Sequence, residues 1–137
     1  MAKPFFFYGT LQRDLAHGEA ARLVANLGEG VPASVRGALF AIDDPQGCYP
    51  VLVRAGSRWV KGRVVDCPDD RCWLAQMDAY EGPEYRRHPM RVRMADGSNV
   101  LAEAYIYRRR CGARLIPIAH GDFARFLAET GRRALSM

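Results

Sequence analysis

An unbroken apolar run near the start of the chain limits its fold more than any other feature. Residues Pro4 to Tyr8 include three consecutive phenylalanines, and the run ends at Gly9. Because it has no polar position that could face water, we expect a strand buried on both faces. The run is too short for a signal peptide, and no small-residue cleavage site follows it. We therefore predict the first core strand of a cytoplasmic protein.

Length and composition fit one folded domain. The chain has 137 residues, of which 49% are hydrophobic and 26% are charged, as in ordinary globular proteins. Repeats, low-complexity tracts and linkers are absent from the sequence, so we predict a single domain over residues 1–137. No stretch approaches the roughly 18 consecutive apolar residues of a membrane span, so no membrane association is expected.

The pattern along the rest of the chain is mostly that of strands, with a few short helices. In residues 90–94 apolar and arginine side chains alternate, as in a half-exposed strand, and Asp96-Gly97 suits the hairpin turn that follows. Strands mixed irregularly with helices favour an α+β fold built on a curled, mixed sheet. The expected strands are residues 4–8, 35–42, 49–54, 58–66, 90–94 and 100–107, and the expected helices are 18–27, 68–81 and 122–128.

The positive charge does not by itself indicate a nucleic-acid partner. The net charge is +5 and the sequence pI is about 9.3, but the arginines are scattered over several predicted elements. No known nucleic-acid-binding motif accompanies them. We expect a solvated basic surface and no nucleic-acid partner. A nucleic-acid-binding domain remains an alternative, and it predicts an affinity that falls steeply with salt.

The cysteines and histidines do not have the spacing of a metal site. The four cysteines form no C-x-x-C pair, and none has metal-ligand spacing to a histidine. We expect no metal and no cofactor, and we interpret the cysteines as small buried hydrophobic residues. Cys48 lies in a plausible loop for a thiol nucleophile, but no histidine is tied to it by sequence. The residues concerned are Cys48, Cys67, Cys72, Cys111, His17, His88 and His120.

Two local features could support chemistry. The first is Tyr8-Gly9-Thr10-Leu11, directly after the buried strand, where the backbone amides of a tight turn can form a concave site for a carboxylate. The second is Glu81, which precedes Gly82-Pro83 at a predicted helix end. A carboxyl group buried there would have a raised pKa, suited to proton transfer near neutral pH. Each pattern alone also fits an ordinary turn and an ordinary exposed glutamate.

The order of short motifs along the chain resembles the γ-glutamylcyclotransferase-like family, particularly its AIG2-like and γ-glutamylamine cyclotransferase branch. The strongest match runs from Met77 to Gly82 and is followed by Tyr85-Arg86-Arg87. Each motif is short, but together they span nearly the whole chain in the family's order. The others are Tyr8-Gly9-Thr10-Leu11, Gly37-Ala38-Leu39-Phe40, Gly47-Cys48-Tyr49-Pro50, Val60-Lys61-Gly62, Ala104-Tyr105-Ile106-Tyr107 and His120-Gly121-Asp122-Phe123.

The resemblance implies a compact, β-barrel-like α+β fold with one cavity and a cofactor-independent enzyme. The substrate would be a small γ-glutamyl compound that cyclises to 5-oxoproline and releases an amine or amino acid. Glu81 would be the acid/base residue, and the amides of Tyr8, Gly9, Thr10 and Leu11 would hold the substrate carboxylate. Tyr85 maps to a tyrosine that contacts the substrate. Phe123 and His120 depart from the family's usual residues, outside the expected chemistry.

A non-catalytic module that holds a small metabolite in the same cavity is the alternative to an enzyme, because a fold does not fix a function. The presence of Glu81 favours catalysis over this alternative. The leaving group and the oligomeric state are not encoded in any pattern that we can interpret.

Overall fold

The structure is a computed structural model that describes residues 2–9, 27–28, 30–45, 47–108 and 115–134. Most of the predicted helix at residues 18–27 lies outside these residues, so that prediction is not tested. The described elements are β1 (Ala2–Phe7), β2 (Val31–Asp44), β3 (Gly47–Pro68), α2 (Arg71–Glu81), β4 (Tyr85–Met94), β5 (Asn99–Tyr107), β6 (Leu115–Pro117) and α3 (Phe123–Thr130).

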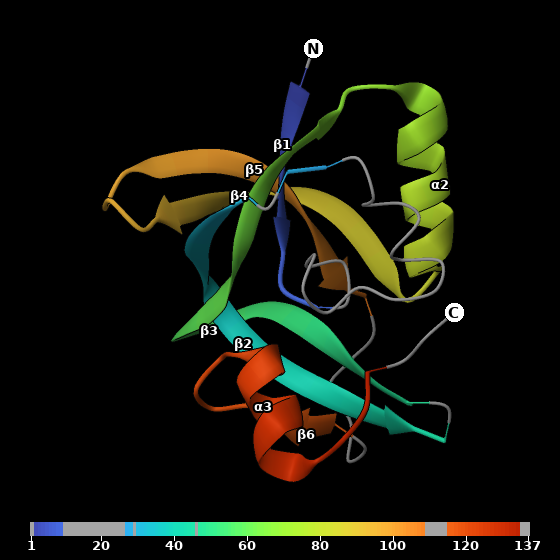
Figure 1. The fold of residues 1–137 in the computed structure, drawn as a ribbon, viewed down its shortest axis with the longest axis vertical. Coiled ribbons are helices and arrows are strands. Elements are labelled where there is room, and N and C mark those ends of the chain that lie inside the picture. The colour runs from blue at the N-terminus through green and yellow to red at the C-terminus, as the bar shows by residue number, and fades with distance from the viewer. Residues whose placement is uncertain (1, 10–26, 29, 46, 109–114, 135–137) are drawn as a thin grey trace.

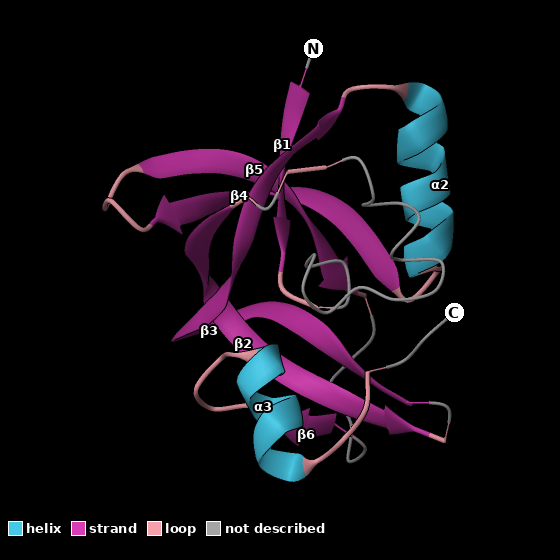
Figure 2. Cartoon of the chain, in the orientation of Figure 1, coloured by secondary structure: helices cyan, strands magenta, loops and turns pink. Residues whose placement is uncertain are grey.

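A closed, mixed sheet forms the body of the molecule (Figures 1 and 2). The strand order is β3-β1-β5-β4-β2-β6. An additional pairing between β2 and β3, at the two ends of the series β3-β1-β5-β4-β2, closes these five strands into a barrel. All of the pairings are antiparallel except that of β1 with β5, which is parallel. The predicted α+β fold with a barrel-like sheet is confirmed.

Strand β1 separates two hydrophobic clusters, as its apolar sequence predicts. Phe6 and Tyr8 join the cluster inside the barrel, whereas Phe5 and Phe7 join a second cluster on the other side of the strand. The three phenylalanines are at most 3% exposed. Burial of a phenylalanine side chain contributes about 1.5–3 kcal/mol, so this short strand stabilises the fold on both faces.

Each of the two described helices covers one of the clusters and is capped at its N-terminus by an aspartate, Asp70 for α2 and Asp122 for α3. Helix α2 packs on the second cluster through the fully buried Met77 and through Trp73, whose ring meets Phe5 edge to face at 5.8 Å. Helix α3 packs Phe123 and Phe126 into the cluster inside the barrel. No helix of the described residues is both long and apolar enough to span a membrane.

The predicted start of α2 was too early. We expected the helix to begin at residue 68, but β3 continues to Pro68 and α2 begins at Arg71. The carboxylate of Asp70 accepts a hydrogen bond from the Cys72 amide at 2.7 Å, so this aspartate caps the helix. An N-cap needs an extended backbone and a short polar side chain, and Asp70 meets both requirements.

The sheet differs from the predicted strands at two places. The strands expected at 49–54 and 58–66 are one strand, β3, in which residues 54–57 have no partner on β2. They form an exposed bulge, and their polar sequence resembles a loop. Strand β6 was not predicted. It is three residues long and pairs with the edge of β2, too short for a periodic pattern.

The cysteines follow the expectation only in part. Cys48 and Cys67 are buried, but Cys72 is exposed in the first turn of α2. The backbone amide of Cys72, and not its thiol, donates to the Asp70 cap. Cys111 lies outside the described residues.

At Gly62, strand β3 passes close to β1. A Cβ atom at this position would lie 2.2 Å from the Phe7 carbonyl oxygen and 2.7 Å from the Phe6 ring. We predict that Gly62→Ala lowers the free energy of unfolding by roughly 1–3 kcal/mol or more, since an added atom must push a buried strand aside. Urea unfolding measures the change. The control is Gly28→Ala, where the new atom meets nothing within 4 Å; equal stability of the two variants would contradict this packing.

Candidate active site

Glu81 occupies the position that its sequence context predicts, at the last residue of α2. Gly82 ends the helix with a φ of 87°, and its amide donates to the Asp78 carbonyl at 3.0 Å. The glutamate is half-buried. A carboxylate at a helix C-terminus faces the negative end of the helix dipole, which disfavours its charge. The local fold therefore places a carboxyl group where it is not easily ionised.

Burial raises the pKa of Glu81 from its ordinary value to about 8, and the negative charge of Asp78 acts in the same direction. A group with this pKa is mostly protonated at pH 7 but keeps a sizeable ionised fraction. It can both accept and return a proton near neutral pH, which is the requirement for general acid–base catalysis. Strongly shifted carboxyl pKa values are concentrated at functional sites.

Tyr8 and Tyr85, both predicted site residues, belong to the electrostatic environment of Glu81. Burial raises the pKa of Tyr8 well above its ordinary value, and the charge of Glu81 adds to the shift. Burial also raises the pKa of Tyr85, with Tyr8 and Glu81 as the next causes. Both hydroxyl groups are thus neutral at physiological pH. The structure brings these three predicted residues together from the residue after β1, from α2 and from β4, which are distant in sequence.

Backbone carbonyl groups fix both tyrosine hydroxyls. The Tyr8 hydroxyl donates to the carbonyl of Tyr105, and the Tyr85 hydroxyl donates to the carbonyl of Pro50 at 2.6 Å. Each proton is already committed, and the Tyr8 oxygen also accepts from the backbone amide of Leu52. One lone pair of Tyr8 and the lone pairs of Tyr85 therefore remain available as acceptors. The site is therefore suited to a ligand that donates hydrogen bonds, such as an ammonium group.

Gly9 is required by a close contact. A Cβ atom at Gly9 would lie 2.5 Å from Cγ of Pro50, so any side chain there would displace the β3 strand or the loop. Gly9 does not have a positive φ. The glycine thus permits close packing against β3 and not a left-handed turn. Thr10 and Leu11, the other predicted residues of this loop, lie outside the described residues.

Sequence reasoning missed the network that holds the end of α2. Tyr105 donates to Oδ1 of Asp78 at 2.6 Å, and the Arg87 side chain bonds the same carboxylate at 3.1 Å. Nη1 of Arg87 also lies 3.4 Å from Oε1 of Glu103. Nζ of Lys3 forms an ion pair with the same oxygen, also at 3.4 Å. The sequence motifs did not identify any of these contacts. The register that sets Arg87 opposite Tyr105 in the β4–β5 hairpin was the available signal.

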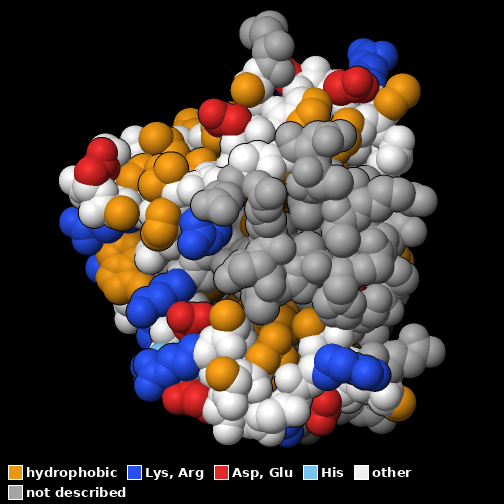
Figure 3. All heavy atoms as spheres, in the orientation of Figure 1, with side chains coloured by type: hydrophobic (Ala, Val, Ile, Leu, Met, Phe, Trp, Pro, Cys, Tyr) orange, Lys and Arg blue, Asp and Glu red, His pale blue; other side chains and the backbone are white. Residues whose placement is uncertain are grey.

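The structure also describes the cysteine, metal-ligand and basic residues that the sequence analysis considered. Cys48 is buried, and burial raises the pKa of its thiol to about 11, which disfavours the nucleophilic thiolate. Within the described ranges, no three His, Cys, Asp or Glu side chains gather as a metal site would need. Lys and Arg side chains on the face shown in Figure 3 stand in several places among Asp and Glu, and not in one stripe.

Solved structures share this fold at low sequence identity. YkqA from Bacillus subtilis is 20% identical with a TM-score of 0.71, and the match covers 96% of this chain and 43% of that one. An AIG2-like protein from Mus musculus is 19% identical with a TM-score of 0.61, covering 89% and 88%. A structure described as a gamma-glutamyl cyclotransferase is 13% identical with a TM-score of 0.65, covering 85% and 72%.

The extent of these matches differs from one relative to another. This chain spans less than half of YkqA but most of the mouse protein. Among curated proteins, none matches the sequence. The family profile described as "Gamma-glutamyl cyclotransferase, AIG2-like" matches residues 5–125, which include the buried strand β1, Glu81 and Tyr85. By this match over most of its length, the chain belongs to the AIG2-like γ-glutamyl cyclotransferase family.

Proposed function

We propose that this protein is a γ-glutamylcyclotransferase that converts a γ-glutamyl amine or amino acid into 5-oxoproline, with Glu81 as general acid/base. The observation that carries the proposal is the half-buried Glu81 carboxyl group, with a pKa of about 8, beside Tyr8 and Tyr85. The family membership supports the same reaction class. No cofactor is needed, because the nucleophile is the substrate's own amino group.

In the proposed reaction, Glu81 accepts a proton from the α-ammonium group of the substrate. The freed amine attacks the γ-carbonyl carbon, a C–N bond closes the five-membered ring, and the bond to the leaving nitrogen breaks. Glu81 then returns its proton to the leaving amine. The α-carboxylate beside the substrate's ammonium group keeps the pKa of that group above the value of about 7.7–8.0 that a peptide amino terminus has. A carboxylate with a pKa of about 8 is therefore a better-matched base than an ordinary glutamate, whose pKa is 4.5.

Positioning of the substrate is the second part of the proposal. The amides of Tyr8, Gly9, Thr10 and Leu11 would hold the α-carboxylate, and the oxygens of Tyr8 and Tyr85 would accept from the α-ammonium group. Alignment of two groups for an intramolecular reaction can lower a barrier by roughly 7–11 kcal/mol. Two observations support such a rigid site. Gly9 packs closely against Pro50, and the hydroxyls of both tyrosines are hydrogen-bonded to backbone carbonyl groups.

The first experiment is 5-oxoproline release from a panel of γ-glutamyl amino acids, γ-glutamyl-ε-lysine and γ-glutamyl polyamines. We predict that Glu81→Gln lowers kcat by at least about a hundredfold, the usual contribution of a general acid–base group, while thermal unfolding shows a folded protein. Glu129→Gln, the same change on the exposed face of α3, is the control and keeps wild-type turnover. Near-wild-type turnover by Glu81→Gln would refute the assignment. Binding of a panel member without turnover by the wild type would indicate the metabolite-binding module instead.

The pH dependence of kcat/KM tests the cause of the raised pKa. Glu81 must be ionised to accept the proton, so activity should rise with pH up to about 8 and then level off. Asp78→Asn removes a charge that raises the pKa of Glu81 but leaves an oxygen for the Tyr105 hydroxyl to bond. We predict that this variant moves the acidic limb to lower pH. Substrate ionisation is the same in both proteins, so the difference reports on the enzyme.

Asp69→Asn, at an exposed aspartate just before α2, is the matched control for the loss of one negative charge. Its acidic limb should coincide with that of the wild type. A limb in the wild type near pH 4–5, or equal shifts in the two variants, would show that Asp78 does not act on Glu81 in this way.

A further inference from the structure

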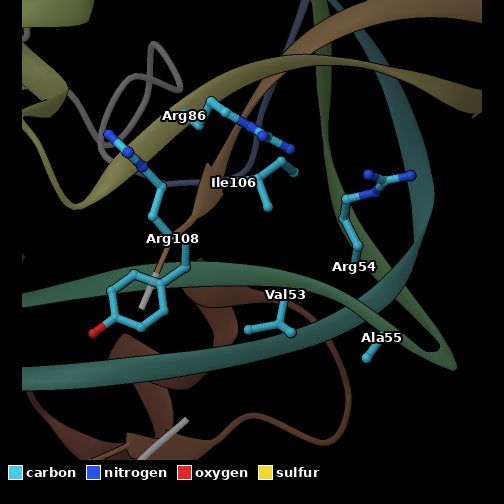
Figure 4. Close-up of a pocket in the computed structure, with 7 residues that line it drawn as sticks. Val53, Arg54, Ala55, Arg86, Ile106 and Arg108 are labelled. Atoms are coloured by element: carbon cyan, nitrogen blue, oxygen red, sulfur yellow. The ribbon is translucent and has the colours of Figure 1, made fainter. Parts of the chain in front are cut away.

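A second concave site lies where β4 diverges from β2. These strands pair only near one end of β4, at Met94 and Arg93. At the other end, Arg86 faces a pocket of about 360 Å³, whose other walls come from residues 53–55 of β3 and residues 106–108 (Figure 4). This volume is within the range of small-molecule sites in proteins. The separation of the strands therefore leaves room for a ligand.

Three arginines make the pocket positively charged. Figure 4 shows Arg54 on one side and Arg86 and Arg108 on the other, with Ile106 between them. All three arginines are exposed, and none of them has an ion pair with a described carboxylate. No described Asp or Glu lines the pocket. The pocket thus concentrates positive charge without a counter-charge from the described part of the chain.

Three arginines elsewhere in the described residues are neutralised by carboxylates, unlike the three at the pocket. Arg87 pairs with Asp78, Arg125 pairs with Glu129, and Arg132 pairs with Asp43. Three guanidinium groups that share one concavity repel one another, and a bound anion would relieve that repulsion. Guanidinium groups also bind carboxylates and phosphates through paired, charge-assisted hydrogen bonds.

We propose that this pocket binds a small organic anion with at least two negative charges carried by carboxylate or phosphate groups. Val53, Ala55 and Ile106 give its walls an apolar part against which a carbon skeleton can pack, while the charged groups reach the arginines. An anion with a single charge would leave guanidinium groups uncompensated. A neutral ligand would gain nothing from the arginines.

The pocket adjoins the Glu81 site without being part of it. Tyr107, which lines the pocket, packs its ring edge-on against Tyr85 at 6.2 Å. The bond from Tyr85 to Pro50 links β4 to β3 next to the pocket residues Arg86 and Val53. The anionic groups can therefore belong to an acidic leaving group that extends from the Glu81 site, or to a free anion. Only the first of these sources rests on the proposed function.

Calorimetric titration with citrate and with inorganic phosphate tests the anion site directly. We predict that the wild type binds citrate and that the Arg86→Gln/Arg108→Gln variant binds it at least about tenfold more weakly, because it lacks two charge-assisted contacts. The Arg54→Gln variant tests the opposite wall and should also weaken binding. Arg91→Gln, at an exposed arginine of β4 outside the pocket, is the matched control and should bind as the wild type does. Absence of binding to the wild type, or equal affinity in all of these proteins, overturns the proposal.

Turnover then identifies the source of the anion. If the acidic part of a substrate occupies the pocket, the double variant raises KM for γ-glutamyl compounds with an acidic leaving group and not for those with an uncharged one. If a free anion occupies it, the variant weakens citrate binding and leaves both KM values unchanged. Should no γ-glutamyl compound be turned over, the proposed function fails while the citrate titration still decides the anion site.

Discussion

Burial of β1 on both faces is the constraint on which the rest of the structure depends. The strand pairs with β3 along its whole length and contacts β5, so it joins the two halves of the barrel. Its phenylalanines fill both hydrophobic clusters, and their combined contribution of roughly 5–9 kcal/mol is comparable to the net stability of a typical domain. Tyr8 and Gly9 directly follow this strand. This buried and fully paired strand therefore leads directly into one wall of the candidate active site.

The buried position of Glu81 lowers the folding stability of the protein at neutral and higher pH. Its folded-state pKa of about 8 lies above the ordinary value of 4.5, so the folded protein loses stability as pH rises through this interval. At about 1.4 kcal/mol per pKa unit, ionisation of Glu81 costs a few kcal/mol, and the buried clusters around β1 offset that cost. The negative charge of Asp78 contributes to the raised pKa of Glu81, and the side chains bonded to Asp78 keep that charge in position. Arg87 and Tyr105 fix this carboxylate in place, so the environment of Glu81 is set by the β4–β5 hairpin as well as by its own helix.

Strong local patterns in the sequence predicted the fold well. The apolar run of β1, the alternation in β4 and the Gly82-Pro83 helix end each give one structure a clear advantage, and the structure agrees with all three. Where a local pattern fits two structures, prediction failed: the exposed bulge at residues 54–57 resembled a loop, and β6 was too short to show a period. The site followed the same division. Glu81, Tyr8 and Tyr85 were predicted through motif order, whereas the roles of Pro50, Tyr105 and the arginine pocket depend on strand register and on the divergence of β4 from β2.

The central claim is that the fold makes Glu81 a proton carrier near neutral pH. Its most direct test is an NMR titration of the side-chain carboxyl carbons in ¹³C-labelled protein, with Glu81→Gln used to assign the Glu81 signal. We predict a midpoint at about pH 8 for Glu81, far above its ordinary value of 4.5. A midpoint near 4.5 would show that Glu81 is an ordinary solvated carboxylate, and it would contradict the account of the site.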